Sequence, residues 1–197
     1  QALEEIRAFI LSLGPTLSED AFERVGRDIW IARDATVAPT ACLNGPLIVD
    51  RGAEIRHCAY IRESAVVGKG AVVGNSTELK NCILFDNAQV PHFNYVGDSI
   101  LGERAHLGAG AVTSNVRSDQ RNVTVHGSVE IPTGRFKLGA MVGDRAEVGC
   151  GSVLNPGAVL GRDCIVYPTS CVRGVVPEGH ILKASGERVR RVNRDEE

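Results

Sequence analysis

The chain has 197 residues and a mass of 21.0 kDa, which corresponds to one domain with short appendages. Lys and Arg number 22 against 24 Asp and Glu, so the net charge of −2 gives no reason to expect nucleic acid or a membrane surface as partner. Aromatic residues make up 5% and hydrophobic residues 43%, so the core must consist of Val, Ile, Leu and Ala. This composition excludes a disordered, a collagen-like and a transmembrane protein.

The N-terminal segment has helical spacing. Its apolar residues recur every three or four positions: Leu3, Ile6, Ile10 and Leu13. Gly14-Pro15 would end this helix, and a second short helix is predicted after Ser18, with Ala21, Phe22 and Val25 turned inward. We expect residues 1–28 to form a helical cap over the open end of the main fold. Because the chain starts with Gln1 and shows no signal-peptide pattern, it has the character of a piece processed from a longer chain.

A six-residue period of apolar residues follows. Its first run is Ile31, Val37, Leu43, Val49, Ile55, Ile61, Val67, Val73, Leu79 and Phe85. A small residue, usually Ala, stands four positions after each of these up to position 71, and the period resumes from Val142 to Val172. Neither the helical period of about 3.6 nor the strand period of about 2 explains this pattern.

A period of six fits a triangular coil in which each side is a short strand and each corner a turn. Three sides give about 18 residues per coil, and coils stack at the ~4.8 Å spacing of strands. The sequence therefore predicts an all-β chain, namely a left-handed parallel β-helix of about seven coils over residues 29–178. Residues 179–197, which include Arg194, would form a basic C-terminal tail.

The period breaks in two regions, where function is most expected. Two five-residue steps are predicted, over residues 91–95 and 96–100, and each would shorten its coil by one residue. The hexads then vanish over residues 113–137. Loops of this length seldom lack a function, and this one is long enough to reach a neighbouring subunit.

Six cysteines show neither a C-x-x-C pair nor the spacing of a zinc site. Several of them replace Ala or Ser in the repeat, so packing explains them better than redox chemistry. We expect reduced thiols in a cytoplasmic protein.

The residues from His92 to Asn115 resemble a known family. A His-x-x-Tyr step leads into Val-Gly-Asp-Ser-Ile-Leu-Gly-Glu and then into Gly108-Ala109-Gly110. This stretch is similar to the acetyltransferase domain of the bifunctional sugar-1-phosphate nucleotidylyltransferase/acetyltransferases, and the resemblance extends over residues 50–183. The nucleotidylyltransferase half has no counterpart, because no Gly-rich phosphate loop occurs near the N-terminus.

The resemblance implies an N-acetyltransferase that uses acetyl-CoA, needs no metal and works as a homotrimer with sites between prisms. The acceptor would be an amino-sugar phosphate such as glucosamine-1-phosphate or galactosamine-1-phosphate. His92 would be the general base, since a neutral imidazole accepts protons near pH 7. Acetyl-CoA contacts are implied at Ala109, Cys150 and Lys183. Acceptor contacts are implied at Arg62, Lys80, Tyr95, His106 and Asn115, with Arg135 or Lys137 added from the long loop.

His106 departs from the family pattern, which usually has an Asn at this position, so the identity of the acceptor sugar stays open. Two other functions also stay open. A zinc enzyme of the γ-carbonic anhydrase type shares the fold, but His92, His106 and His126 are 14 and 20 residues apart and lack the required His pair. The second alternative is an inactive β-helix scaffold or regulatory subunit, although a scaffold has no physical need of His92, Tyr95 and Asn115 together.

Overall fold

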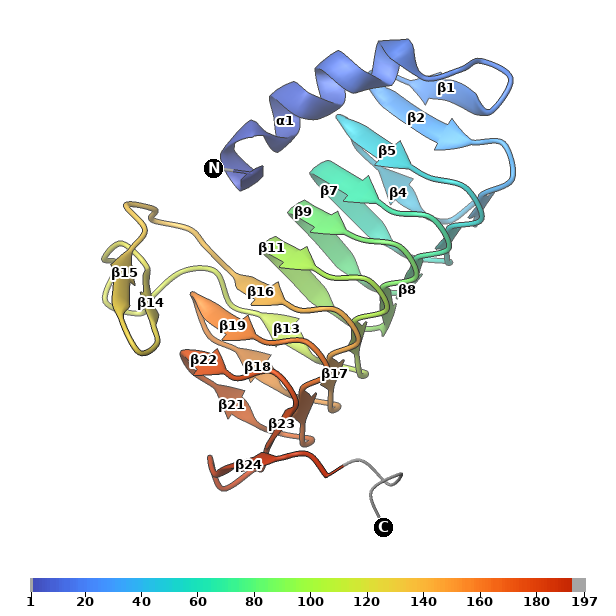
Figure 1. Cartoon of the computed structure of the whole chain (residues 1–197). Helices are drawn as coiled ribbons and strands as arrows, with labels where there is room; N and C mark the ends of the chain where they lie inside the picture. The colour runs from blue at the N-terminus through green and yellow to red at the C-terminus, as the bar shows by residue number, and fades with distance from the viewer. Residues whose placement is uncertain (1, 193–197) are drawn as a thin grey trace.

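The computed structural model describes residues 2–192 and consists of triangular coils stacked in parallel layers (Figure 1). Strands of one coil pair with the equivalent strands of the next. Thr36 pairs with Glu54, 18 residues further on, and this spacing recurs along the stack. The predicted all-β fold, a left-handed parallel β-helix, is confirmed. Gln1 and residues 193–197, including Arg194 of the predicted tail, lie outside the described residues.

The stack has three sides, which we number in chain order. The first side contains β2 (Ile29–Ala32), β5 (Leu47–Val49), β16 (Ala140–Val142), β19 (Ala158–Leu160) and β22 (Val175–Val176). The second side contains β3 (Thr36–Val37), β6 (Glu54–Ile55), β8 (Val72–Asn75), β10 (Gln89–His92), β12 (His106–Leu107), β17 (Glu147–Val148), β20 (Ile165–Val166) and β23 (His180–Leu182). The third side contains β4 (Cys42–Leu43), β13 (Val112–Thr113), β18 (Val153–Leu154) and β21 (Cys171–Val172).

Three longer strands turn a corner and so contribute to both the third and the first side. They are β7 (Tyr60–Val67), β9 (Glu78–Leu84) and β11 (Tyr95–Leu101). An antiparallel strand closes each end of the stack, since β1 (Phe22–Gly26) pairs with β2 and β24 (Arg188–Arg190) pairs with β23. These strands cover backbone edges that would otherwise be unpaired.

The inward positions carry the six-residue period. The branched residues Val49, Ile55, Ile61 and Val67 are fully buried, and so are the small residues Ala59, Ala65 and Ala71. One branched and one small side chain per side fill a narrow triangular core, which is why the sequence needs few aromatic residues.

The coil shortens at two corners, and the predicted position of one of them was wrong. The buried residues Val96 and Leu101 are five positions apart, in agreement with the predicted step over 96–100. The other five-residue step lies between the buried residues Leu79 and Leu84, and not over residues 91–95.

This earlier step changes which residue enters the core. A regular six-residue period from Leu79 predicts Phe85 in the core, whereas Leu84 is fully buried and Phe85 is 51% exposed. The tight corner that makes this possible contains Lys80 and Asn81, and Asn81 has a φ of 49°. Asparagine tolerates this left-handed conformation better than most residues.

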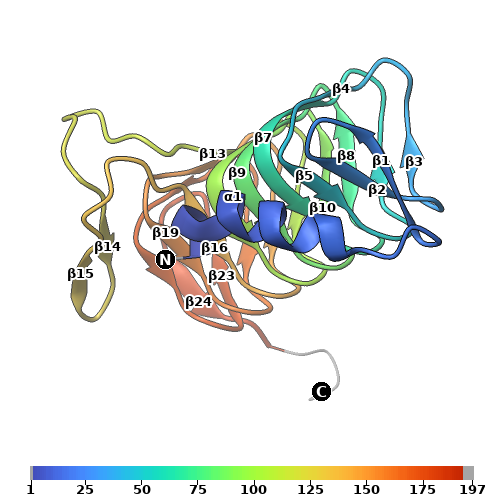
Figure 2. The same ribbon diagram turned by 90° about the horizontal axis from the view of Figure 1, so that it is seen from above.

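The predicted N-terminal helix is confirmed as α1 (Ala2–Leu13), followed by the 3-10 turn η1 (Gly14–Thr16). It does not cap the end of the stack, because it runs along the outside of the first side (Figures 1 and 2). Ile6 and Ile10 are buried there against Trp30 and Ile48. No helix of the described chain is long and apolar enough to span a membrane.

The second predicted helix was wrong. The segment after Ser18 enters β1 (Phe22–Gly26), whose residue Val25 is 52% exposed instead of turned inward. The pairing of β1 with the edge of β2 satisfies backbone groups that a helix would leave exposed on the first coil, so tertiary context prevails over the local pattern.

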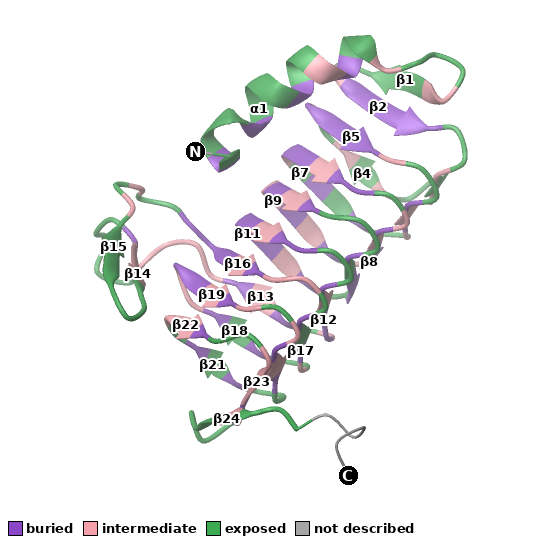
Figure 3. Ribbon diagram, viewed as in Figure 1, coloured by how far each residue is buried: buried purple, intermediate pink, exposed green. Residues whose placement is uncertain are grey.

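The long loop, which we call the arm, comprises residues 114–139 between β13 and β16. It contains an antiparallel hairpin, β14 (Thr124–His126) and β15 (Glu130–Pro132), that projects from the stack (Figure 1, yellow). Its base returns to the first side, where Val123 and Leu138 are buried with Leu3 of α1. The arm and α1 thus cover the first side, while the tip of the hairpin is exposed (Figure 3).

Candidate active site

The third side lies between two corners that contain most of the predicted site residues. His92 stands at the corner where the second side ends, and Asp98 stands at the corner inside β11 where the third side ends. A side of about four residues is on the order of 13 Å wide. Both corners therefore border one narrow face of the stack.

The first corner, which we call the His92 edge, consists of His92, Ala109 and Cys150 in successive coils. Backbone hydrogen bonds align them, since Gly110 N donates to His92 O at 3.0 Å and Gly151 N donates to Ala109 O at 2.8 Å. The His92 side chain is exposed, and its imidazole makes no hydrogen bond within residues 2–192. Three residues predicted separately therefore form one continuous edge.

The turn Gly108-Ala109-Gly110, one coil after His92, contains one backbone N–H that can donate to a ligand. In Gly108-Ala109-Gly110, Gly108 N donates to Val148 O at 2.7 Å and Gly110 N donates to His92 O. The N–H of Ala109 has no acceptor in the described part of the chain. A backbone N–H in this position can donate to an oxygen that gains negative charge during a reaction.

Lys183 lies at the far end of the same corner. It directly follows β23, whose Leu182 pairs with Val166, and so stands two coils beyond Cys150. Its Nζ forms an ion pair with Glu187 Oε2 at 3.0 Å. The predicted cofactor residues are thus brought to one corner, with Lys183 at its C-terminal end.

The second corner contains a network that we call the Asp98 cluster: Lys80, Asn81, Tyr95, Asp98 and Asn115. Asp98 is 3% exposed. Its carboxylate accepts hydrogen bonds from Asn115 Nδ2 at 2.6 Å and Asn81 Nδ2 at 2.8 Å, and Lys80 Nζ lies 3.5 Å away. A buried carboxylate is stable only with such partners, so Asp98 fixes the side chains around it.

Tyr95 joins the cluster through Asn115, whose Nδ2 also donates to the Tyr95 hydroxyl at 3.2 Å. Burial, together with the negative charges of Asp98 and Glu78, raises the pKa of Tyr95. Arg62 lies one coil before Lys80 and two coils before Tyr95, and its Nη1 is 3.3 Å from Glu78 Oε1. The structure thus brings Lys80, Tyr95 and Asn115 together and leaves Arg62, at 50% exposure, nearby.

The other predicted acceptor residues lie elsewhere. His106 is on the second side, where Nδ1 is 2.8 Å from Glu147 Oε2. Arg135 in the arm forms an ion pair with Glu4 of α1, with Nη1 2.7 Å from Oε1. Lys137 is exposed, and its backbone forms a bridge with Val116.

Sequence reasoning missed Asp98 and Asn81, although both stand in or beside stretches that drew attention. A signal was present, because an Asp between Val96-Gly97 and Ser99-Ile100 places a charge among buried positions. Within residues 2–192, no three His, Cys, Asp or Glu side chains come together as a candidate metal site.

Comparison with known proteins gives a family model and several relatives that match part of the chain. The family model for the GMPPB C-terminal domain matches residues 43–136. The bifunctional sugar-1-phosphate nucleotidylyltransferase/acetyltransferase of Sulfurisphaera tokodaii is 32% identical over 109 residues, which are 55% of this chain and 27% of the relative. The bifunctional protein GlmU of Synechococcus elongatus is 29% identical over 157 residues, which are 80% of this chain and 27% of the relative.

Among solved structures, a point mutant of GDP-perosamine N-acetyltransferase from Caulobacter crescentus, in complex with CoA and GDP-perosamine, is 21% identical. The alignment covers 95% of this chain and 66% of that one, with a TM-score of 0.37. The chain spans about a quarter of the length of the curated relatives named above. The sequence matches confirm the resemblance to the bifunctional sugar-1-phosphate nucleotidylyltransferase/acetyltransferases.

Proposed function

We propose that this chain transfers the acetyl group of acetyl-CoA to the amine of an amino-sugar phosphate, of which glucosamine-1-phosphate and galactosamine-1-phosphate are the leading candidates. The observation that carries the proposal is the arrangement of the third side. Residues suited to the thioester line one corner of this face, and residues suited to a sugar phosphate gather at the other.

In this proposal the acceptor amine attacks the thioester carbonyl, so a C–N bond forms and the C–S bond breaks. His92 removes a proton from the amine as general base, and its imidazole is exposed on this edge. The N–H of Ala109 donates to the oxygen that becomes negative in the tetrahedral intermediate. The coenzyme A thiolate then leaves and takes the proton that His92 removed from the amine, which restores the neutral imidazole.

Acceptor binding falls to the Asp98 cluster and Arg62. A guanidinium and an ammonium suit a phosphate group, and Tyr95 and Asn115 suit sugar hydroxyls. Because Asp98 accepts hydrogen bonds from both Lys80 and Asn115, it holds the two side chains in fixed positions. Arg135 is tied to α1 by Glu4, which favours Lys137 as the arm cation in this role.

We further propose a homotrimer with its sites between neighbouring stacks. The first side is covered by α1 and the arm, which leaves the second and third sides for association. The third side presents Tyr60 at 39% exposure and Val153 at 36% exposure, which provides apolar area for a second copy. Sedimentation velocity at micromolar concentration should give a trimer, and a monomer would contradict this arrangement.

The decisive experiment measures release of the coenzyme A thiol from acetyl-CoA with glucosamine-1-phosphate, galactosamine-1-phosphate, their 6-phosphates and the free sugars. His92→Ala should lower turnover by a factor of ~10² or more. His57→Ala is the matched control, because His57 lies on the same edge two coils earlier and should have no effect. No turnover with any acceptor, from a folded chain, would favour the scaffold function instead.

A further inference from the structure

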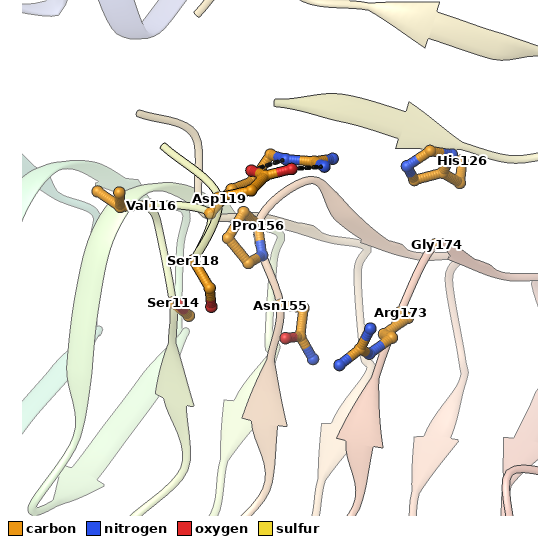
Figure 4. A pocket seen from close by; sticks show the side chains of 10 residues that line it. Ser114, Val116, Ser118, Asp119, His126, Asn155, Pro156, Arg173 and Gly174 are labelled. Carbon is orange, nitrogen blue, oxygen red and sulfur yellow. Dashed lines mark hydrogen bonds and ion pairs between the residues drawn. The ribbon is translucent and has the colours of Figure 1, made fainter. Parts of the chain in front are cut away.

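A pocket of about 430 Å³ opens directly beyond the Asp98 cluster, where the arm passes over the stack (Figure 4). Its floor consists of Ser114, Asn155 and Arg173, which occupy equivalent corner positions in three successive coils. Its roof consists of arm residues, among them Ser118 and His126. We call this space the arm pocket.

An ion pair orders the roof, and one close backbone contact joins the roof to the stack. Within the roof Arg117 donates two hydrogen bonds to Asp119, at 2.9 and 2.6 Å. At the far end of the pocket Gly174 of the stack lies directly against the carbonyl oxygen of His126, where a Cβ atom would overlap that oxygen. The φ of Gly174 is +67°, so this close approach and this backbone conformation both require glycine.

Open spaces with polar groups occur at both ends of the arm, but the polar groups are engaged to different degrees. At the base, Val123 and Leu138 pack against Leu3, and the cation beside them, Arg135, forms an ion pair with Glu4. The arm pocket combines apolar and polar lining, and several of its polar side chains have no partner in the part of the chain that the structure describes. An open space with such polar groups is typical of a ligand site.

The unpaired groups of the arm pocket favour an anion. Arg117 neutralises Asp119, which is the only carboxylate in the lining. Arg173 forms no ion pair with a carboxylate within residues 2–192, and its guanidinium lies beside the Cys171 thiol. The hydroxyls of Ser114 and Ser118 make no hydrogen bond in this part of the chain, and His126 uses only Nδ1, 2.9 Å from Glu130 Oε1.

We propose that the arm pocket binds a ligand through a phosphate or diphosphate group, with Arg173 as the anchoring cation. A guanidinium donates in a planar fork that matches phosphate oxygens, and two serine hydroxyls and an imidazole complete the donor set. The volume lies in the range of small-ligand sites, about 300–1,000 Å³, and exceeds what a single phosphate fills. A nucleotide and coenzyme A both carry this group, and binding does not require the acetyl transfer proposed above.

Isothermal titration calorimetry of the full chain with inorganic pyrophosphate, UDP and coenzyme A tests the proposal. We expect at least one of the three to bind, and Arg173→Ala to weaken that binding tenfold or more. Arg162→Ala is the matched control, because Arg162 is an exposed arginine at another corner, 3.3 Å from Asp144, and should change the Kd less than twofold. Binding of UDP alone would identify a nucleotide, binding of coenzyme A alone the coenzyme, and binding of pyrophosphate alone the free diphosphate.

Two outcomes would overturn the proposal: no binding of any of the three below ~1 mM, or equal losses in Arg173→Ala and Arg162→Ala, which would indicate nonspecific attraction of anions. Circular dichroism of each variant confirms that it is folded. His92→Ala separates the two proposals, because it should lower turnover by a factor of ~10² or more and leave UDP and pyrophosphate binding unchanged. Binding that depends on Arg173 in a chain without turnover would retain the arm pocket and reject the proposed transfer.

Discussion

The two corners of the third side are built by different means. On the His92 edge the residues are aligned by main-chain hydrogen bonds that repeat from coil to coil, so neighbouring side chains contribute little to their position. In the Asp98 cluster the positions depend on side chains that converge on one buried carboxylate. The first corner should therefore respond mainly to changes of backbone, and the second to changes of single side chains.

The largest effect is expected at Asp98. Asp98→Ala leaves Lys80 and two amides without their partner, which should lower the free energy of unfolding by about 3–5 kcal/mol. Asp98→Asn keeps the shape and is the variant for kinetics. It should raise KM for the acceptor about tenfold or more through the loss of a charged hydrogen-bond acceptor, with KM for acetyl-CoA unchanged. An equal rise in both KM values would show that the two corners are not separate.

The matching change on the His92 edge is Gly74→Ala. A Cβ at Gly74 would overlap the carbonyl oxygen of Pro91, the residue before His92, so the backbone there must shift. We expect the free energy of unfolding, measured by urea unfolding, to fall by about 1–3 kcal/mol, and turnover to fall as well. Gly52→Ala is the control, because nothing lies within 4 Å of its added Cβ. Gly52→Ala should lower the free energy of unfolding by about 1 kcal/mol, because Gly52 has a left-handed backbone conformation with a φ of 63°. It should leave turnover unchanged.

A smaller effect is expected from pH at Tyr95. Its raised pKa means that the folded chain keeps the phenol neutral at pH values where the unfolded chain, with a pKa of about 10, ionises it. This contribution to stability is complete below pH ~10 and is lost as the pH rises further. The urea midpoint should therefore fall less between pH 9 and pH 11 in Tyr95→Phe than in the original chain. An identical fall would place Tyr95 in a solvated environment.

The smallest effect concerns thiol reactivity, which distinguishes Cys171 from the other cysteines. The Asn155 amide donates to its Sγ at 3.1 Å and, with the nearby Arg173 guanidinium, lowers the pKa of Cys171. Burial raises the pKa of Cys82 to about 12 and that of Cys164 to about 11. At pH 7.5 a thiol reagent should label exposed Cys171 first and leave Cys82 and Cys164 intact until unfolding. Mass spectrometry that found Cys150 labelled first would contradict this order.

The sequence predicts features that follow from the repeating backbone better than features that depend on contacts between side chains. A coil of repeating hexads fixes which residues face inward and which corners stack, so the fold could be predicted. The alignment of Cys150 with Ala109 could not be predicted, because Cys150 stands 41 positions further on, beyond the arm, where the hexads vanish. The position of the first short step could not, because Leu84 and Phe85 are equally apolar and only a one-residue change in register separates them.

The remaining differences arise from tertiary contacts that a local pattern does not contain. The segment from Phe22 to Gly26 becomes a strand because β2 offers an unpaired edge. Asp98 joins Lys80 and Asn115 from positions 17 or more residues away, which no local spacing indicates. Arg135 could be placed only once α1 was known to lie along the first side.

The pairing across the arm has a consequence for folding. Most strands pair with partners 17 or 18 residues away, but Ile100 pairs with Met141, 41 residues further on. The entropy of closing a loop grows only with the logarithm of its length, so this junction costs about 0.8 kcal/mol more than an ordinary coil. The arm can therefore change in length and sequence at little cost to the stack, which makes it the part of the molecule where new recognition can evolve without a new fold.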